Sequence, residues 1–183
     1  MLLPRDIPNP DQITALEQRY GCVDGGACET CILLLHTAND VVGAFCTHLS
    51  AHEMSQGRFI VLMMLNREPE KVFMPSHLAE LCSVTKATMT GLIDGLERDG
   101  LVTRHPSQED RRATFVGLSP KGVELMDRIL PGHFARVSTL MQDLTVAERA
   151  EFRRLLAKVR EGVGRVKGLN VGAGCAHEAC AGD

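Results

Sequence analysis

Three cysteines near the N-terminus have the spacing of sites that bind soft metal ions or exchange disulfides. The stretch CVDGGACETC contains Cys22, Cys28 and Cys31, and the last two form a Cys-x-x-Cys pair. Closely spaced thiolates bind zinc, another thiophilic metal such as copper(I), or an iron–sulfur cluster, and a Cys-x-x-Cys pair also forms reversible disulfides. The residues leave three interpretations open for Cys28 and Cys31: a metal site, a redox site, or ordinary reduced thiols.

Two more cysteines lie near the C-terminus in the stretch CAHEAC, which contains Cys175, His177 and Cys180. Residues 167–183 include few large apolar side chains, so we expect a flexible tail that buries little surface. The metal and redox interpretations extend to these thiols, as does the alternative that they are incidental.

A second group of candidate residues is basic and lies in the middle of the chain. Lys86 falls at the start of a predicted helix, and Arg111 and Arg112 fall at the tip of a predicted hairpin. From Lys86 to Lys121 the six basic residues outnumber the five acidic ones by one, and the whole chain has a formal net charge of −3. Attraction to nucleic acid must therefore come from a local patch. On charge alone, DNA binding and an ordinary solvated surface both remain open.

The elements expected around these basic residues are two short helices, a tight turn and a β-hairpin. Pro75 suits the first turn of PSHLAELCS, and Thr85 can cap the helix KATMTGLIDGLERD, which should end at Gly100. LVTRH and ATFVGLS read as two short strands that flank a charged turn. This arrangement is a winged helix-turn-helix.

The second helix of this unit should have one apolar face and one small, polar face. The residues predicted to face the core are Val84, Met89, Ile93 and Leu96. The residues predicted to face outward are Lys86, Ala87, Thr90 and Gly91. A helix fits the major groove, small side chains allow close approach to base edges, and arginines at a wing tip suit a narrow minor groove.

Longer helices should flank this unit, because apolar residues recur at helical spacing in 29–49, 120–144 and 145–166. Ser55 is a predicted N-cap for QGRFIVLMMLNRE, and TVAE at Thr145–Glu148 is a capping box. The expected fold is mainly α with a small β-hairpin wing. The expected domains are an N-terminal arm (1–28), a helical dimerisation region (29–54 and 120–166), the winged helix-turn-helix domain (55–119) and the flexible Cys-containing tail (167–183).

Other residues in the predicted helices have a structural and a functional interpretation. Cys46 and Cys82 are expected to be small buried hydrophobic residues. The histidines of the helical segments are expected to be polar surface or interface residues, although one pair shares a helix face as metal-binding pairs do; they are His36, His48, His52 and His133. The methionines Met54, Met63 and Met64 either line an apolar pocket or simply fill the core.

The chain resembles the MarR family of bacterial transcriptional regulators from about Glu29 to Val166. The stretches that carry the resemblance are MSQGRFIVLMML, PSHLAELCSVTKATMTGLIDGLERDGLV, DRRATFVGLSPKG and TVAERAEFRRLLAKV. The third is similar to the family's wing signature of Asp-x-Arg, a strand, and then Leu-Ser/Thr-x-x-Gly.

The resemblance implies a set of DNA-binding residues on the second helix and the wing. They are Thr85, Lys86, Thr88, Thr90, Arg104, Asp110, Arg111 and Arg112. In this set Arg112 would enter the minor groove, Asp110 would pair with a neighbouring arginine, and Arg104 and Arg111 would contact phosphate. The threonines and Lys86 would contact bases or phosphates.

The resemblance also implies a function. The protein would be a repressor that binds double-stranded DNA at a pseudo-palindromic operator as a homodimer, and a small-molecule effector, thiol oxidation or a metal would release it. The alternative from another class is a thiol-based metal or redox protein whose winged unit contacts proteins. The chain has no phosphate loop and no nucleophile elbow, so we do not expect an enzyme.

The N-terminal stretch MLLPRDIPNPDQ has no apolar run long enough for a signal peptide or a membrane helix. We therefore expect a cytoplasmic protein with no membrane partner, in which structural disulfides are uncommon.

Overall fold

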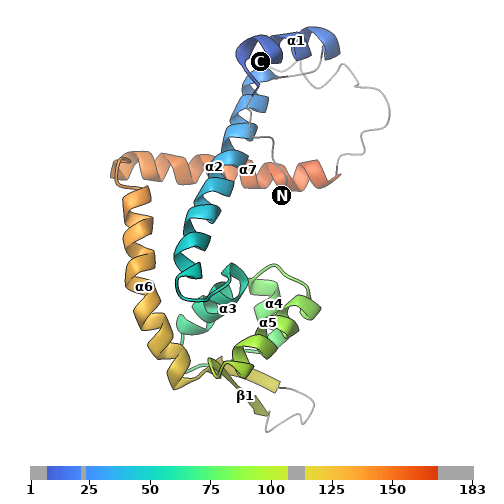
Figure 1. Ribbon diagram of the computed structural model, residues 1–183. Helices are drawn as coiled ribbons and strands as arrows, with labels where there is room; N and C mark the ends of the chain where they lie inside the picture. The colour runs from blue at the N-terminus through green and yellow to red at the C-terminus, as the bar shows by residue number, and fades with distance from the viewer. Residues whose placement is uncertain (1–7, 22–23, 107–113, 169–183) are drawn as a thin grey trace. The chain divides into compact units, whose positions relative to one another are not determined.

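The computed structural model describes residues 8–21, 24–106 and 114–168. These residues form seven α-helices and one two-stranded antiparallel sheet (Figure 1). In chain order the elements are α1 (Pro10–Tyr20), α2 (Gly25–Ser50), α3 (Gln56–Asn66), α4 (Pro75–Leu81), α5 (Lys86–Arg98), β1 (Val102–Pro106), β2 (Thr114–Leu118), α6 (Pro120–Leu140) and α7 (Val146–Gly168). The predicted mainly helical fold with a hairpin wing is confirmed.

The chain divides into two compact units. One comprises Gly43–Leu140, which we call the winged unit. The other comprises the described residues of Met1–Val42 and Met141–Asp183, which we call the helical unit. The helix α2 runs through the boundary between them.

The core of the winged unit is built from apolar side chains of four helices and the sheet. Those with no exposed surface are Val61, Leu62, Leu65, Leu78, Met89, Ile93, Leu96, Val116, Met126 and Ile129. The predicted inward face of α5 is therefore confirmed at Met89, Ile93 and Leu96. It is wrong at Val84, which is 36% exposed because it precedes the N-cap of α5 and does not follow the helical spacing.

The local signals that begin and end the helices act as predicted. The hydroxyl of Ser55 accepts from the backbone N–H of Arg58, and the hydroxyl of Thr85 accepts from that of Thr88. Pro75 occupies the first turn of α4. Gly100 has a φ of +73°, the left-handed conformation in which glycine ends helices.

The junction of α5, β1 and α6 depends on a second glycine. A Cβ atom on Gly122 would lie 2.1 Å from the carbonyl oxygen of Leu101, so only glycine allows this approach of α6 to the start of β1. The hydroxyl of Ser119 donates to the carbonyl of Gly100 at 2.6 Å and joins the same two segments. These contacts fix the position of the C-terminal end of α5 relative to the first residues of the hairpin.

Two helix boundaries differ from the prediction. The glycine-rich start of α2 is helical from Gly25, whereas the sequence pattern indicated a start near Glu29. Asp24 accepts from the N–H of Ala27 at 2.9 Å and Glu17 accepts from that of Gly25 at 2.8 Å, so side chains stabilise the first turn. The helix α6 ends at Leu140 and not at 144, because residues 141–144 form a turn before the Thr145–Glu148 capping box.

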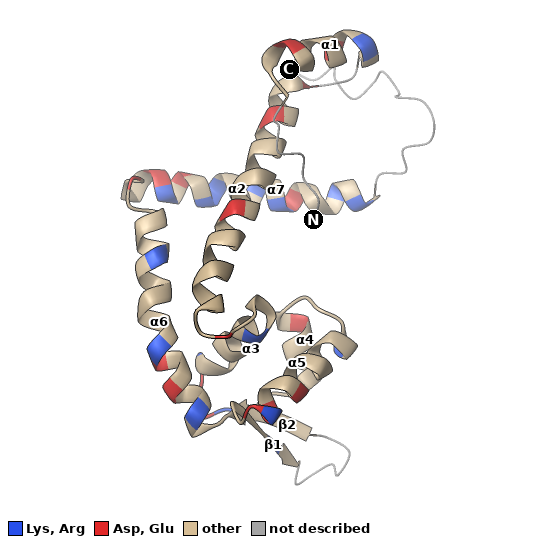
Figure 2. Cartoon of the chain, in the orientation of Figure 1, with Lys and Arg blue, Asp and Glu red and all other residues tan. Residues whose placement is uncertain are grey.

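The helical unit exposes much apolar surface. No side chain of α7 is buried, and its apolar residues Phe152, Leu155, Val159 and Val163 are all 42–49% exposed. The helix α2 has only two charged residues, and it is drawn almost entirely tan in Figure 2. By length and composition alone α2 could cross a membrane, with a mean hydropathy of 1.3 over its most apolar 18 residues, but core helices of soluble proteins and signal sequences pass the same test.

Candidate nucleic-acid interface and effector pocket

The N-terminal half of α5 presents the residues that the sequence predicted for DNA. Lys86, Ala87, Thr90 and Gly91 are all exposed, as predicted. The hydroxyls of Thr85 and Thr88 lie 2.8 Å apart and are engaged in the N-cap of the helix. The hydroxyl of Thr90 donates to the carbonyl of Lys86 at 2.9 Å, which leaves its oxygen lone pairs free to accept a hydrogen bond.

The wing consists of the antiparallel strands β1 and β2, which follow α4 and α5 in the chain. Its register places Val102 opposite Leu118 and Pro106 opposite Thr114. Phe73 forms a single β-bridge with Val116 through two backbone hydrogen bonds of 2.8 Å, so the segment before α4 is attached to β2. Three predicted wing residues, Asp110, Arg111 and Arg112, lie outside the described residues.

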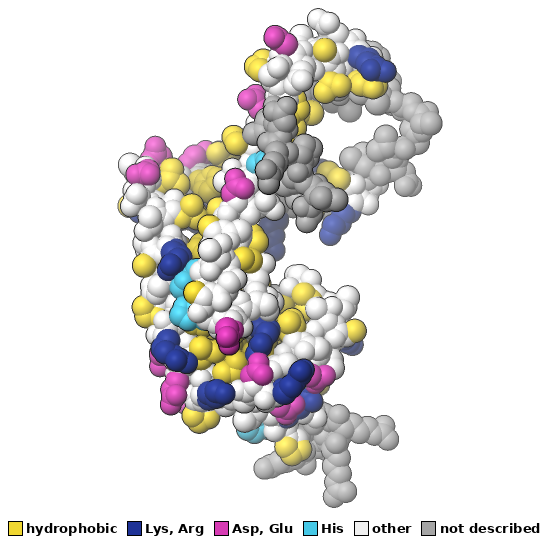
Figure 3. Space-filling view, viewed as in Figure 1, with side chains coloured by type: hydrophobic (Ala, Val, Ile, Leu, Met, Phe, Trp, Pro, Cys, Tyr) yellow, Lys and Arg dark blue, Asp and Glu magenta, His cyan; other side chains and the backbone are white. Residues whose placement is uncertain are grey.

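Arg104 is not directed at solvent alone. Its guanidinium group pairs with the carboxylates of Asp94 and Glu97 on α5, the second at 3.3 Å. A further arginine, Arg58 of α3, pairs with Asp99 at the C-cap of α5. In the view of Figure 3 basic and acidic side chains are interleaved over the lower part of the molecule. Some of the charged side chains therefore form ion pairs between elements of the winged unit.

An apolar cavity of about 260 Å³ lies within the winged unit between α2, α3 and α6. It is lined by Phe45, Leu49, Gln56, Phe59, Ile60, Met63, Met64 and His133. Two of the three methionines that the sequence suggested for a pocket, Met63 and Met64, are among them. Met54 is instead buried and lines a separate polar cavity with Arg58 and Lys121.

Two histidines lie in or beside the apolar cavity. The ring of His133 packs against the rings of Phe45 and Phe59, with centroids 5.1 and 4.9 Å away. The ring of His48 meets that of His52 edge-on at 5.2 Å. The atoms His133 Nδ1 and His48 Nε2 are buried without a protein hydrogen-bond partner. The expectation of surface or interface histidines is thus wrong for His48, which is 8% exposed.

Burial is the main reason that the pKa of each of these histidines is lowered. The positive charge of Arg136 lowers the pKa of His48 further, and a hydrogen bond to the backbone of Ile129 opposes the change. For His133 the second cause is His48 and the third is Arg136. The lowered pKa favours neutral imidazoles at physiological pH, and in a neutral imidazole one ring nitrogen donates a hydrogen bond and the other accepts one.

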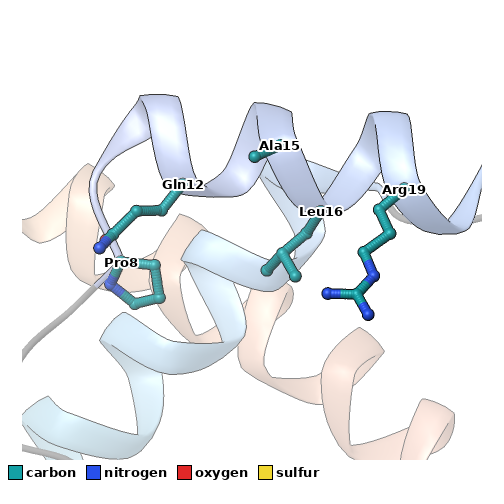
Figure 4. A pocket seen from close by; sticks show the side chains of 5 residues that line it. All are labelled: Pro8, Gln12, Ala15, Leu16 and Arg19. Atoms are coloured by element: carbon teal, nitrogen blue, oxygen red, sulfur yellow. The ribbon is translucent and has the colours of Figure 1, made fainter.

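A further groove of about 470 Å³ lies on α1. Figure 4 shows its lining side chains, which are Gln12, Ala15, Leu16 and Arg19 on the helix and Pro8 on the segment just before it. Because every lining residue belongs to one short segment, this groove is an open surface, and it does not gather groups from different elements.

The Cys-x-x-Cys pair lies within α2. Cys28 and Cys31 are exposed free thiols one helical turn apart. Among the described residues no group of three histidine, cysteine or acidic side chains has the arrangement of a metal site. The other candidate redox cysteines, Cys22, Cys175 and Cys180, lie outside the described residues.

The two internal cysteines are partly buried. The Cys46 sulfur lies 3.9 Å from Gln56 Oε1, and Cys82 packs against the core. Burial raises the pKa of Cys82 and keeps it a thiol, which agrees with the predicted structural role.

Comparison with known proteins agrees with the geometry. The model of the MarR family matches residues 52–113. The HTH-type transcriptional repressor YetL of Bacillus subtilis is 31% identical over 157 residues, which cover 86% of this chain and 94% of that protein. The HTH-type transcriptional regulator MhqR of the same species is 26% identical over 112 residues, 61% of this chain and 76% of that protein.

Solved structures share the fold. MepR of Staphylococcus aureus in complex with DNA has a TM-score of 0.66 at 18% identity, covering 72% of this chain and 94% of that one. BpsR of Bordetella bronchiseptica, whose DNA binding is regulated by 6-hydroxynicotinic acid, has a TM-score of 0.61 at 23% identity, covering 70% and 96%. The related proteins are regulators and not enzymes, as we expected. The chain belongs to the MarR family of winged helix-turn-helix transcriptional regulators.

Proposed function

We propose that the protein is a repressor that binds double-stranded DNA through α5 and the wing. The observation that carries the proposal is the exposed N-terminal half of α5, which is small at Ala87 and Gly91 and basic at Lys86, beside a hairpin in the same unit. A helix N-terminus of this kind suits both base edges and phosphates. The related MepR has been crystallised with DNA, which supports the same use of the fold here.

The proposed contacts follow the roles that the family resemblance implies. Lys86, Thr88 and Thr90 contact bases or phosphates from α5, with Thr85 at its N-cap. On the wing, Arg112 enters the minor groove, Arg111 contacts phosphate and Asp110 holds an arginine in place. Arg104 also belongs to this implied set, although its guanidinium has two carboxylate partners.

The proposed functional form is a homodimer. The apolar stripe of α7 has no partner among the described residues, and its members recur at spacings of three and four: Phe152, Leu155, Val159, Val163 and Val166. A second copy of the chain would bury such a stripe, as obligate dimers do. Two-fold symmetry then requires a pseudo-palindromic operator.

We place this dimer in the cytoplasm, where its DNA is, with α2 in the protein interface and not in a membrane. Relatives of the chain are transcriptional regulators, which supports this placement. The last turn of α2 also buries His48 and Leu49 in the winged unit.

The proposed release mechanism is a small effector in the apolar cavity. Its volume of about 260 Å³ and its lining of aromatic, aliphatic and methionine side chains suit a small aromatic molecule. Gln56 and His133 supply the polar atoms that would orient an acid or phenol. Regulation of the related BpsR by 6-hydroxynicotinic acid supports this ligand class. Oxidation or metal binding at Cys28 and Cys31 is the second proposed route.

Nuclease footprinting on DNA from upstream of the protein's own coding sequence tests the proposal. A homodimer predicts two protected half-sites whose centres are about one helical turn, or about 10 base pairs, apart. Protection of a single short site would contradict the dimer. Protection of no site on any duplex, together with stoichiometric bound metal, would favour the alternative of a thiol-based metal protein.

A further inference from the structure

Three ion pairs join the C-terminal half of α5 to its neighbours. Arg104 of β1 pairs with Asp94 and Glu97, and Arg58 of α3 pairs with Asp99. In addition, the ammonium group of Lys121 donates to the backbone carbonyl of Asp99 at 2.8 Å. Thus every acidic side chain of α5 and its C-cap is paired with an arginine from another element.

The geometry of Arg104 indicates that its guanidinium group makes its contacts within the protein. Asp94 and Glu97 are three residues apart on one face of α5, and the two terminal nitrogens of Arg104 bind one carboxylate each. Its side chain is 35% exposed, less than that of either partner. The group of three carries one positive and two negative charges, so a phosphate near it would meet a net negative charge.

The position of Arg104 in the chain shows that these ion pairs affect the angle between α5 and the wing. Between the end of α5 and β1 the backbone passes through Gly100, which has the left-handed conformation and whose carbonyl accepts from the hydroxyl of Ser119 at 2.6 Å. That contact restrains the junction itself, whereas Arg104 acts farther along the strand. Arg104 lies two residues into β1 and reaches back to the last two turns of α5, so it restrains the angle between the helix and the wing.

We propose that Arg104 is a positioning residue for DNA binding and not a phosphate ligand. It holds the wing strand against α5 through Asp94 and Glu97, so that the helix and the wing reach their two grooves together. This inference rests on the proposed DNA-binding function and replaces the phosphate-binding role implied for Arg104 by the family resemblance.

The two roles predict opposite results when the carboxylates are removed. The double variant Asp94→Asn/Glu97→Gln loses two negative charges from the helix that faces DNA. If Arg104 binds phosphate, the variant frees its guanidinium and removes repulsion, so DNA binding becomes tighter. If Arg104 positions the wing, the variant loses the restraint, and DNA binding becomes weaker in spite of the favourable change in charge.

The test is fluorescence anisotropy of the full chain on the footprinted duplex at several salt concentrations. A matched control, Glu124→Gln/Asp127→Asn, removes two exposed carboxylates from α6 that take part in no ion pair among the described residues. We expect the control to bind as tightly as the wild type or slightly more tightly, and the Asp94/Glu97 variant to bind about tenfold more weakly. Surface ion pairs contribute little to folding, so the variant should unfold at nearly the wild-type temperature.

A second variant separates positioning from charge at Arg104 itself. Arg104→Gln should weaken binding to a similar extent, while the slope of log affinity against log salt stays at the wild-type value. If Arg104 neutralised a phosphate, its removal would instead reduce that slope by about 0.9 for each phosphate. Equal or tighter binding by Asp94→Asn/Glu97→Gln, or a reduced slope for Arg104→Gln, would overturn the inference while leaving the DNA-binding function intact. If the wild type binds no duplex, the proposed function fails, and the inference falls with it.

Discussion

The ring of His48 on α2 lies directly against Gly132 on α6, where a Cβ atom would be only 3.2 Å from His48 Cε1. Arg136 closes the same space, with its Nη1 at 3.3 Å from that position and donating to the Gly132 carbonyl at 2.9 Å. The absence of a side chain at residue 132 therefore allows α2 and α6 to pack closely beside the apolar cavity.

Replacing Gly132 by leucine should destabilise the winged unit. A glycine within a helix normally costs stability, but here the added side chain would collide with a buried histidine, and overpacking of this kind costs about 1–3 kcal/mol. Urea denaturation at fixed protein concentration measures the loss. The control is Gly91→Ala on the outer face of α5, where nothing lies within 4 Å, and which should gain about 0.5–1 kcal/mol. If the urea midpoint of the Gly132→Leu variant equals that of the wild type, α2 and α6 are farther apart at this position than the structure shows.

The stability of the winged unit should fall as the pH decreases below about 6.5. Burial lowers the pKa of both His48 and His133 from that ordinary value, so between pH 6.5 and the lowered pKa the unfolded chain binds more protons than the folded one. The full stabilisation is present above pH 6.5 and is lost as protons are taken up. Urea denaturation between pH 8 and pH 5 measures the effect.

The double variant His48→Gln/His133→Gln is the control for this pH dependence. Because glutamine does not titrate in this range, the variant should lose stability less steeply between pH 7 and pH 5 than the wild type. Equal slopes would place the responsible groups elsewhere in the protein.

The dimer should depend on the apolar stripe of α7. In the variant Val159→Glu/Val163→Glu, two carboxylates replace side chains that are each 49% exposed in the single chain, so the monomer should tolerate them while the dimer should not. Light scattering on a sizing column should give the 20.0 kDa of one chain for the variant and twice that mass for the wild type. A dimeric variant would show that another surface joins the two copies.

The thiol route of release should depend on Cys28 and Cys31 together. Two thiols reduce one peroxide molecule and form a disulfide, and residues one helical turn apart must approach more closely than in a regular helix to do so. Oxidation should therefore distort the start of α2. The change Cys28→Ser/Cys31→Ser should abolish any effect of peroxide or zinc on DNA affinity, whereas Cys82→Ser should not. A response that persists in the double variant would assign sensing to other thiols.

Much of the winged unit follows from local sequence. Ser55, Pro75, Thr85 and Gly100 act through interactions with residues a few positions away, so their roles were evident without a structure. The left-handed conformation of Ser83, with a φ of +54°, was not evident, because nothing in its side chain requires it.

The candidate sites were predicted less completely, since they are formed by segments distant in sequence. The start of α2 was placed too late because the acceptor Glu17 belongs to another helix. The cavity unites Phe45, Phe59 and His133, and no periodic pattern connects them. The pairing of Arg104 with Asp94 and Glu97 likewise requires the turn at Gly100, which brings β1 back along α5.

The most direct test of the central claim is the salt dependence of DNA affinity for the wild type and for Lys86→Gln, measured by fluorescence anisotropy on DNA from upstream of the coding sequence. The account predicts tight binding that weakens steeply with salt, because each dimer neutralises several phosphates. It also predicts that the slope for the variant is shallower by about 0.9 for each phosphate that the lysine neutralises in the wild type. Weak binding by the wild type with little dependence on salt, or a variant with unchanged affinity and slope, would contradict the assignment of α5 as the helix that reads DNA.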